Sequence, residues 1–306
     1  MEDINQLLLG TTQKYVSATA TISRVENLPI DPGVSGVNVR RYKLTLDDAR
    51  QARLVTRPAP LAERRSLTRL GTQGHTCVPF SYTLDLTTNA VALVCMQDVG
   101  DKVVAYTPIA SRQAAAGLAK IHQLNLGKEG ELGWLPRTDR AYFVDFILNV
   151  CWRPEWERSL ANTVFVREFG QYIEAVEASA ANLPDIMQNL YELSDTLTLV
   201  HTDIYYSHVL EYQARPYFID WGQTRYGSLY LDIPSHFYSL EMAQIYRQEL
   251  AALSIELNPA DFERNYHLAG RFVALRYVWW WLNDWKTRPN NWNKSVLLSM
   301  LKRAIG

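Results

Sequence analysis

The strongest constraint on the fold is a change of sequence pattern at Gly100. Before it, residues 34–46, 51–57 and 79–100 have the composition and spacing of strands, and residues 60–71 have helical spacing. After it, apolar residues recur at helical spacing in 108–126, 140–151, 163–183, 184–194, 235–253 and from Pro259 onward. This order predicts an α+β fold with a small β-rich lobe at 1–97 and a larger, mainly helical lobe at 98–306.

Local turn signals divide the strand-rich part. Asp47-Asp48 is expected to turn the first hairpin, and residues 87–89 are expected to turn the second. Gly71 is expected to end the helix between the two hairpins. The nearly continuous apolar run at 91–96 predicts a strand buried on both faces.

Composition excludes several classes of function. The chain has 306 residues, 47% hydrophobic, and a net charge of −1, so no general field attracts nucleic acid or an anionic membrane. No apolar run reaches the length of a membrane span, and no signal peptide is indicated at the N-terminus. Cys77, Cys95 and Cys151 lack metal-ligand spacing, so buried free thiols and a cytoplasmic protein are expected. The oligomeric state is not indicated.

Residues 199–223 carry the chemistry. His201-x-Asp203 is followed by His208 and then by an apolar strand that ends at Asp220. Phosphoryl transfer uses such a pair of carboxylates, one to take or orient the hydroxyl proton and one to hold magnesium. A lone Asp203 is also compatible with a turn or a helix cap, and the second carboxylate at a strand end favours the catalytic interpretation.

This stretch resembles the catalytic segment of the aminoglycoside phosphotransferase and choline kinase-like group, which has the protein kinase-like fold. The resemblance implies that Asp203 is the catalytic base, that His201 braces the loop, and that Asp220 in Phe-Ile-Asp-Trp-Gly binds Mg²⁺. Residues 227–232 resemble the next segment of that group. The resemblance makes Asp232 a structural acid.

A second stretch, residues 93–100, resembles the hinge of the same group. There the backbone of Gln97, Asp98 and Val99 would bind the nucleotide base, which makes 1–97 the nucleotide-binding lobe. Residues 118–122 resemble the helix that follows this hinge. The resemblance thus runs in order from about residue 30 to 240.

His208 departs from the pattern of the group. It stands where most members have Asn, a second magnesium ligand, although macrolide phosphotransferases also carry His there. Imidazole is a poorer partner for a hard cation than an amide oxygen is. The two interpretations are that His208 faces the metal, directly or through water, or that it only packs.

The other departure is a missing lysine. The third strand of the group carries a Lys that grips the phosphates and pairs with a helix Glu, here Glu63, but residues 54–57 contain only Arg57. Arg57 is one residue out of phase, so a regular strand would turn it away from the cleft unless a bulge at Pro58 restored it. Other candidate phosphate partners are Arg40, Arg41 and Arg53. A phosphate-covering loop is expected at Gly33, Ser35 and Gly36.

Aromatic residues suggest where the acceptor binds. Tyr205 and Tyr206 replace the usual pair within the catalytic loop and would face the acceptor. Trp281 and Trp285 share a helical face and would either border the acceptor pocket or pack in a helical core. Such a wall favours a bulky, partly apolar or cationic hydroxylated compound.

Together these features predict a small-molecule O-phosphotransferase. It would move the γ-phosphate of ATP or GTP, with Mg²⁺, to a hydroxyl of an antibiotic-type or choline-type acceptor. The alternative is a kinase-like ligand-binding protein with weak or no activity, suggested by the missing Lys and by His208. A protein kinase is disfavoured because no activation segment ending in Ala-Pro-Glu follows Asp220.

Overall fold

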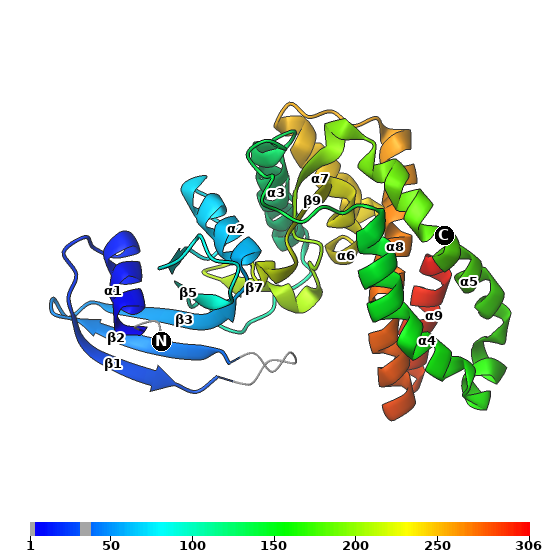
Figure 1. Cartoon of the computed structure of the whole chain (residues 1–306), viewed down its shortest axis with the longest axis horizontal. Helices are drawn as coiled ribbons and strands as arrows, with labels where there is room; N and C mark the ends of the chain where they lie inside the picture. Colours follow the sequence, from blue (N-terminus) through cyan, green and yellow to red (C-terminus); the bar gives the residue numbers. More distant parts are fainter. Residues whose placement is uncertain (1–3, 31–37) are drawn as a thin grey trace. The chain divides into compact units, whose positions relative to one another are not determined.

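The computed structural model describes residues 4–30 and 38–306 (Figure 1). Contacts between Cα atoms divide the chain into two compact units. The first contains the residues up to Leu124 together with Asp203–Thr224, and the second contains Asn125–Thr202 and Arg225–Gly306. The two chain segments 1–97 and 98–306 are a different division, and the lobe boundary after Gln97 stays a prediction.

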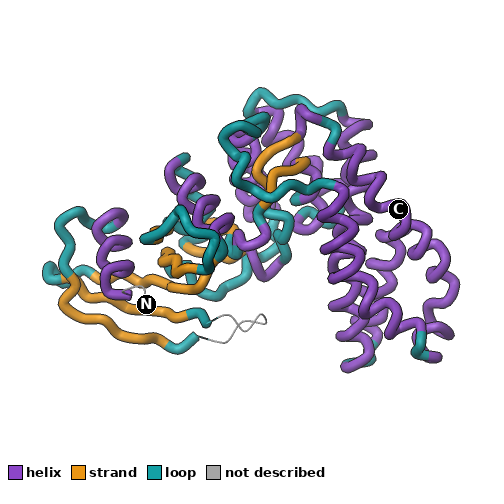
Figure 2. The backbone as a smooth tube through the Cα atoms, viewed as in Figure 1, coloured by secondary structure: helices purple, strands orange, loops and turns teal. Residues whose placement is uncertain are grey.

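The first unit is built on one antiparallel sheet with the strand order β1-β2-β3-β5-β4, drawn in orange in Figure 2. Its elements up to Leu124 are α1 (Ile4–Tyr15), β1 (Ile22–Leu28), β2 (Arg40–Leu46), β3 (Gln51–Ala59), α2 (Leu61–Thr72), β4 (Ser81–Thr83), β5 (Ala92–Gln97) and α3 (Pro108–Asn125), the last of which ends in the second unit.

Both predicted hairpins are present. The turn between β2 and β3 includes Ala49, whose φ of 64° is a left-handed value. β4 pairs with β5, and Asp85 organises the loop between them by accepting hydrogen bonds from the backbone N–H groups of Thr87 and Thr88. On β5, Val94 and Cys95 point to opposite faces and are both buried, as the apolar run predicts, whereas Val91 before the strand is exposed.

Helix α2 was predicted correctly except for its end. It begins directly after Pro60, whose extended backbone suits a helix boundary, and it runs through Gly71 to Thr72. Gly71 was therefore wrongly expected to end it. The chain turns at Gly74 instead, where φ is 73°.

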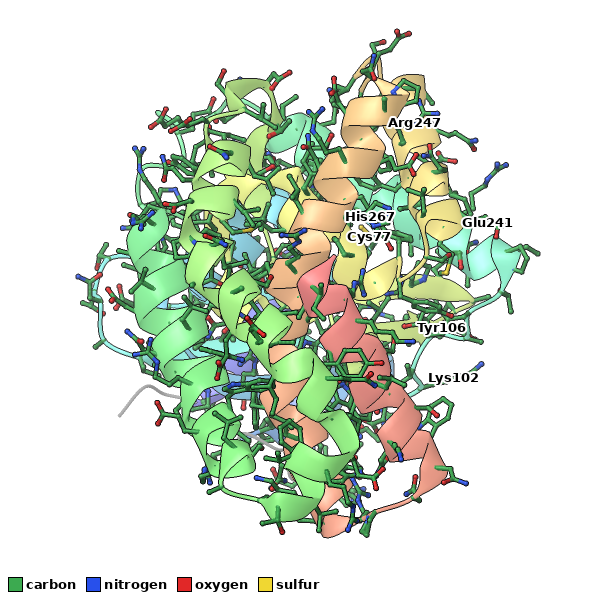
Figure 3. The ribbon with its side chains drawn as sticks, turned by 90° about the vertical axis from the view of Figure 1, so that its right-hand side faces the viewer. Cys77, Lys102, Tyr106, Glu241, Arg247 and His267 are labelled. Atoms are coloured by element: carbon green, nitrogen blue, oxygen red, sulfur yellow. The ribbon has the colours of Figure 1, made fainter. Side chains whose placement is uncertain are left out.

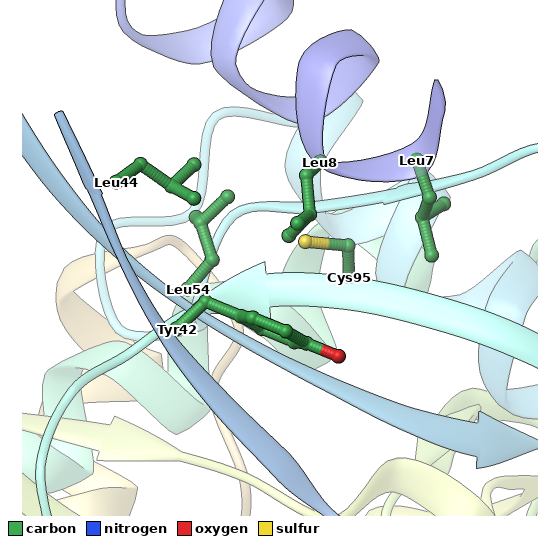
Figure 4. Packing of buried hydrophobic residues seen from close by; sticks show 6 residues of the cluster. All are labelled: Leu7, Leu8, Tyr42, Leu44, Leu54 and Cys95. Atoms are coloured by element: carbon green, nitrogen blue, oxygen red, sulfur yellow. The ribbon is translucent and has the colours of Figure 1, made fainter. Parts of the chain in front are cut away.

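Helix α1 and strand β1 were not predicted. Leu7 and Leu8 of α1 pack onto Tyr42, Leu44, Leu54 and Cys95 of the sheet, and all six side chains are almost fully buried (Figure 4). Each buried leucine contributes about 1.5–3 kcal/mol through removal of apolar surface from water. The helix therefore covers one face of the sheet and leaves the other face for the site described below.

The remaining part of the first unit, Asp203–Thr224, follows the segment Asn125–Thr202, which belongs to the second unit. It contains η3 (Tyr206–His208), the hairpin of β7 (Val209–Tyr212) and β8 (Arg215–Phe218), and η4 (Trp221–Gln223). Val103 forms a β-bridge with Leu210, and Lys102, labelled in Figure 3, makes an ion pair with Glu211. The segment after β5 is thereby joined to β7.

The second unit consists mainly of helices. Its elements are η1, a π-helix (Tyr142–Trp152), α4 (Arg153–Leu160), α5 (Thr163–Tyr191), η2 (Ser194–Thr196), β6 (Leu197–Val200), β9 (Arg225–Ser228), η5 (Leu229–Leu231), α6 (Ile233–His236), α7 (Leu240–Ala252), α8 (Pro259–Thr287) and α9 (Asn291–Ile305). Strands β6 and β9 pair antiparallel. Asn162, Ser239, Asn258 and Asn290 cap helices α5, α7, α8 and α9 through their side-chain oxygens.

Three helical predictions need correction. The predicted helix at 235–253 is two helices, α6 and α7, because α6 ends at His236 and Ser239 caps the start of α7. The predicted helices at 163–183 and 184–194 are one helix, α5, which continues through the buried Pro184. The predicted helix at 140–151 forms, but with π-type hydrogen bonding over Tyr142–Trp152.

The α+β fold class is confirmed, with the sheet in the N-terminal part of the chain and helices dominating the rest. Cys77 and Cys95 are buried free thiols as expected, while Cys151 is partly exposed. Within the two described ranges, no helix combines the length and apolar character needed to cross a membrane.

Candidate active site

The loop that follows β6 is fixed by a buried carboxylate. Asp232 accepts hydrogen bonds from the backbone N–H groups of His201, at 2.8 Å, and Thr202, at 2.6 Å. His201 and Asp232 are both fully buried. Thr202 has a φ of 60°, a left-handed value that a β-branched residue rarely adopts, and the hydrogen bond that its N–H donates to Asp232 holds it there. These contacts set the path of the chain as it enters Asp203.

His208 lies between two carboxylates. Its Nδ1 is 2.7 Å from the backbone oxygen of Asp203 and 4.0 Å from Oδ2 of the same residue, and its Nε2 is 3.7 Å from Oδ2 of Asp220. A carbonyl oxygen can only accept, so Nδ1 carries the proton of this bond. In the neutral ring the lone pair then sits on Nε2, on the side of Asp220. The sequence left open whether His208 faces the metal or only packs, and the structure places its Nε2 beside the Asp220 carboxylate.

Asp220 occupies a tight turn directly after β8. Its φ of 62° is left-handed, which aspartate tolerates better than most residues. Ile219 donates its N–H to the His208 backbone oxygen, and the buried Trp221 donates its ring N–H to Phe218. With both neighbours anchored, the Asp220 side chain projects outward and is 44% exposed. This exposure leaves room for a cation and its water ligands.

Arg57 joins Asp220 to Glu63. One terminal guanidinium nitrogen lies 2.9 Å from Oδ1 of Asp220 and also makes a close ion pair with Oε1 of Glu63 on α2. The Arg57 side chain is only 13% exposed. Arg57 therefore provides a cation beside Glu63, where the resemblance to the phosphotransferase group predicts a Lys.

The phase argument against Arg57 was wrong. The pairing of β3 with β5 runs regularly through Arg57 opposite Val94 and Pro58 opposite Leu93, so no bulge is needed. Thr56 is buried toward the core side, and Val55 and Arg57 share the other face of the strand. Of the other arginines, Arg41 lines the same cavity as Arg57 but lies against Asp98, Arg53 contacts the same Asp98 carboxylate, and Arg40 lines a different cavity.

Glu63 is completely buried beneath this site. Burial is the largest influence on its carboxyl group and raises the pKa to about 7; Arg57 opposes the shift and Asp220 adds to it. Its Oε2 has no hydrogen-bond partner among the described residues. A Cβ at Gly222 would lie 3.5 Å from that oxygen, so the turn after Asp220 packs directly against it.

A cavity of about 260 Å³ opens on the same face of the sheet and lies wholly in the first unit. Val55 and Met96 line the cavity from the sheet, and Leu210 and Ile219 line it from the β7–β8 hairpin and the residue after it. The predicted hinge residues Gln97, Asp98 and Val99 form its edge. Arg57 and Asp220 lie on its border. Sequence reasoning missed Leu210 and Ile219. Their signal is the apolar pattern on both sides of the hairpin, which was read only as a strand.

The predicted hinge, residues 97–99, is held by an ion-pair cluster. The Asp98 carboxylate is buried, with Oδ2 3.2 Å from Nε of Arg41 and 3.1 Å from Nε of Arg53. Asp98 Oδ1 accepts the Gly100 N–H, and Arg41 makes two further hydrogen bonds to the exposed Asp101. Among the described residues the buried backbone N–H of Val99 makes no hydrogen bond. The predicted phosphate-covering residues Gly33, Ser35 and Gly36 lie outside the described residues.

The aromatic candidates differ in exposure. Tyr206 is 47% exposed and its ring lies 4.6 Å from that of Tyr205. Trp281 is partly buried, and its ring nitrogen has no hydrogen-bond partner among the described residues. Trp285 is buried against Phe165 and Phe169. Its role is therefore in the helical core, which is the second of the two interpretations for the tryptophans.

The donor set suits magnesium that is completed by other ligands. The described residues contain no group of three or more His, Cys, Asp or Glu side chains that could hold a metal ion alone. Mg²⁺ in phosphoryl-transfer sites is commonly bound by one or two carboxylates plus water and substrate phosphates. The exposed Asp220 carboxylate with the Nε2 face of His208 fits that pattern.

The sequence profile of the phosphotransferase enzyme family, APH, matches residues 30–270. The chain belongs to this family. The predicted enzyme class, a phosphotransferase with an alcohol group as acceptor, and the predicted family resemblance are thereby confirmed.

Solved structures share the fold of this phosphotransferase over nearly the whole chain. Spectinomycin phosphotransferase APH(9)-Ia, in complex with ADP and spectinomycin, has a TM-score of 0.56 at 12% identity and covers 98% of this chain and 93% of its own. Macrolide 2′-phosphotransferase MphH from Brachybacterium faecium gives 0.50 at 14%, covering 97% and 98%. Choline kinase LicA from Streptococcus pneumoniae gives 0.52 at 12%, also covering 97% and 98%. These identities establish the fold alone, and no match was found among curated proteins.

Proposed function

We propose that this phosphotransferase moves the γ-phosphate of ATP or GTP to a hydroxyl group of a small molecule. Asp203 accepts the hydroxyl proton, the bond from the acceptor oxygen to phosphorus forms, and the bond between the β-phosphate bridging oxygen and the γ-phosphorus breaks. The observation that carries the proposal is the contact of Arg57 with both Glu63 and Asp220 at the edge of the 260 Å³ cavity.

Arg57 would grip the phosphates of the donor. Its guanidinium presents several N–H donors in a fixed plane, which suits bidentate contact with phosphate oxygens. Glu63 holds one side of the group from the buried floor, so the remaining donors can turn toward a ligand. Because catalysis of phosphoryl transfer is mainly positioning and charge neutralisation, an anchored arginine can take the part of the missing lysine.

Asp220 and His208 would hold Mg²⁺, and the cation would neutralise charge on the donor phosphates when bound. Two features of the chain support this assignment. Asp220 is exposed at the mouth of the cavity, and the proton on Nδ1 of His208 directs the Nε2 lone pair to the same side. His208 would thus present a ring nitrogen to the metal, where the Asn expected in most members of this group would present an amide oxygen.

Asp203 would be the base. Its side chain is 19% exposed, and the backbone oxygen of the same residue is bonded to the ring of His208, so the base and the metal-facing imidazole are fixed to each other. The nucleotide base would enter between Val55, Met96 and Leu210 and bond to the backbone of Val99, whose N–H has no partner among the described residues.

The acceptor would be an antibiotic-type or choline-type hydroxyl compound that contacts the exposed Tyr206 and its neighbour Tyr205. Aromatic faces bind bulky apolar or cationic groups.

A second candidate function is nucleotide sensing with little transfer. One observation favours it: Arg57 is bound to Asp220, the residue expected to bind the metal, so metal binding must compete with an ion pair. The two functions share the cavity and differ in turnover.

The test compares Asp203→Asn with Asp261→Asn, a control at an exposed site on α8. Binding of Mg·ATP and Mg·GTP is measured by calorimetry, and phosphate transfer is measured with a panel of hydroxylated antibiotics, choline and sugars. We expect donor binding in all three proteins, and transfer in the wild type and Asp261→Asn only. If the wild type binds the donor but shows neither phosphate transfer nor slow nucleotide hydrolysis, nucleotide sensing is favoured. If Asp203→Asn transfers phosphate as fast as the wild type, Asp203 is not the base.

A further inference from the structure

A second cavity, of about 430 Å³, lies in the first unit away from the candidate active site. Its walls come from the end of α2 and the loop after it, from one face of α3, and from the tip of the β7–β8 hairpin. It shares no lining residue with the 260 Å³ cavity of the donor. Its volume falls within the range of small-molecule sites.

The lining is rich in nitrogen donors. Lys120 comes from α3, Arg215 from the hairpin, and Gln73, His75 and Gln113 add amide and imidazole groups. The described residues that line the cavity include no aspartate or glutamate. Neither Lys120 nor Arg215 makes an ion pair with a carboxylate in the described part of the chain, although Lys120 donates a hydrogen bond to Gln123. Both residues are exposed to solvent, and no carboxylate in the described part of the chain neutralises their two positive charges.

The state of His75 fits this excess of positive charge. Its Nε2 is 3.1 Å from Oε1 of Gln73. Burial, and to a smaller extent the charge of Lys120, lower the pKa of the imidazole to about 4. The ring is therefore neutral at pH 7 and sits beside cations. A bound anion would oppose the effect of Lys120 and would accept a hydrogen bond from a ring N–H.

The end of helix α2 does not require these cations. A helix C-terminus carries partial negative charge and often attracts Lys or Arg. Here three of its last four carbonyls are already used, because Gln73, Gly74 and His75 donate their N–H groups to the carbonyls of Arg69, Gly71 and Leu70, respectively. Lys120 and Arg215 are therefore not explained as caps of α2.

The cavity is built by close packing of the loop on α3. A Cβ at Gly117 would lie 2.9 Å from Sγ of Cys77, so only glycine lets the loop approach this closely. Cys77, labelled in Figure 3, accepts the N–H of Phe218 at 2.8 Å through its backbone oxygen. Strand β8 runs from Arg215 in the cavity wall to Phe218, two residues before Asp220. A ligand on Arg215 would thus bind at one end of the strand that positions Asp220 at the other.

We propose that this cavity is a second ligand site, for a small phosphate-bearing anion, in which Lys120 and Arg215 bind the phosphate and Gln73, His75 and Gln113 add hydrogen bonds. The site is distinct from that of the donor nucleotide. Phosphate would bind there whether or not the protein catalyses phosphoryl transfer.

Calorimetric titration with inorganic phosphate, at constant ionic strength against sodium chloride, tests the site. Four proteins are compared: the wild type, Lys120→Gln/Arg215→Gln, Arg57→Gln, and the charge-matched control Lys128→Gln/Arg264→Gln, whose residues are exposed in the second unit. We expect saturable binding in the wild type, in Arg57→Gln and in the control, and at least a tenfold loss of affinity in the Lys120/Arg215 variant. Two lost charge-assisted hydrogen bonds give a change of this size.

Proton NMR of the His75 ring gives a readout that needs no variant. Phosphate should raise the pKa of His75 from its value of about 4, so its ring resonances should move on addition of phosphate at pH 5. Three outcomes would each overturn the proposal. In the first, phosphate does not bind the wild type, and in the second it binds the Lys120/Arg215 variant with equal affinity. The third outcome is that binding is lost only in Arg57→Gln while the His75 resonances do not move. Failure of phosphoryl transfer would leave these results unaffected.

Discussion

The guanidinium of Arg57 lies 2.9 Å from the carboxylate of Asp220, although the two residues are 163 positions apart in the chain. The contact joins strand β3 to the turn after β8 and places a fixed cation beside the carboxylate expected to bind the metal. Glu63 completes the group from below. The same three residues would therefore bind phosphate, position the metal ligand and link the sheet to α2.

Replacement of Arg57 should weaken donor binding strongly. We expect Arg57→Gln to lower kcat/KM for the nucleotide about 100-fold, since a partly buried charge-assisted contact to phosphate is lost. Arg57→Lys keeps the charge but not the planar fork, so a loss of about tenfold is expected. Steady-state kinetics with varied Mg·nucleotide measure both.

The matched control is Arg24→Gln, at a side chain that is 71% exposed on β1. It should change kcat/KM by less than about twofold, since surface ion pairs contribute little. Equal effects at Arg24 and Arg57 would show that general charge, rather than the site, controls donor binding.

Glu63 should make stability depend on pH. Its pKa is raised to about 7 in the folded protein, mainly by burial, so the folded state holds a proton that the unfolded state releases near the ordinary glutamate value. This contribution is fully present below the unfolded pKa and is lost as pH rises through about 7. Relative to Glu63→Gln, the metal-free wild type should lose up to about 3 kcal/mol between pH 5 and pH 8.

Urea unfolding of both proteins at several pH values measures the difference. Glu131→Gln, at an exposed glutamate, serves as the control and should follow the wild type at every pH. A constant gap between the wild type and Glu63→Gln across this range would mean that Glu63 titrates at its ordinary pKa.

Much of the site could be predicted because its residues lie in short, ordered motifs. Asp203, His208 and Asp220 fall within one stretch of sequence, and the structure brings His208 between the other two. The phase of Arg57 could not be predicted in this way. It depends on which side of β3 faces the core, and that side is set by Leu54 and Thr56 packing toward α1, a helix that the sequence pattern did not reveal.

The missed features share a physical cause. Helix α1 has only 12 residues, a length at which an isolated helix is marginal, so its stability comes from Leu7 and Leu8 packing on the sheet. Proline signals failed for the same reason at Pro184, which is buried within the continuous helix α5. Tertiary packing overrode local preference in both cases.

His208 should set the choice of metal. We expect His208→Ala to raise the Mg²⁺ concentration needed for half-maximal activity about tenfold, because a group on the metal-facing side is removed. His208→Asn replaces nitrogen with a harder amide oxygen, so it should favour Mg²⁺ over Mn²⁺ more than the wild type does. Activity titrations with each metal at fixed nucleotide give the ratio. An unchanged ratio and unchanged Mg²⁺ requirement in both variants would assign His208 a packing role only.

The two aspartates that contact Arg41 should differ sharply in their effect on stability. Asp98 is buried, and its removal leaves Arg41, which is only 8% exposed, without its inner partner at the edge of the donor cavity. Asp98→Ala should therefore lower the free energy of unfolding by about 3 kcal/mol and also raise KM for the nucleotide, since the hinge loses its anchor. Asp101 binds the same arginine but is 73% exposed, so Asp101→Ala should cost less than about 1 kcal/mol and leave KM nearly unchanged. Urea unfolding and nucleotide kinetics on both variants check the contrast, and similar losses from the two would mean that Asp101 shares the structural role assigned to Asp98.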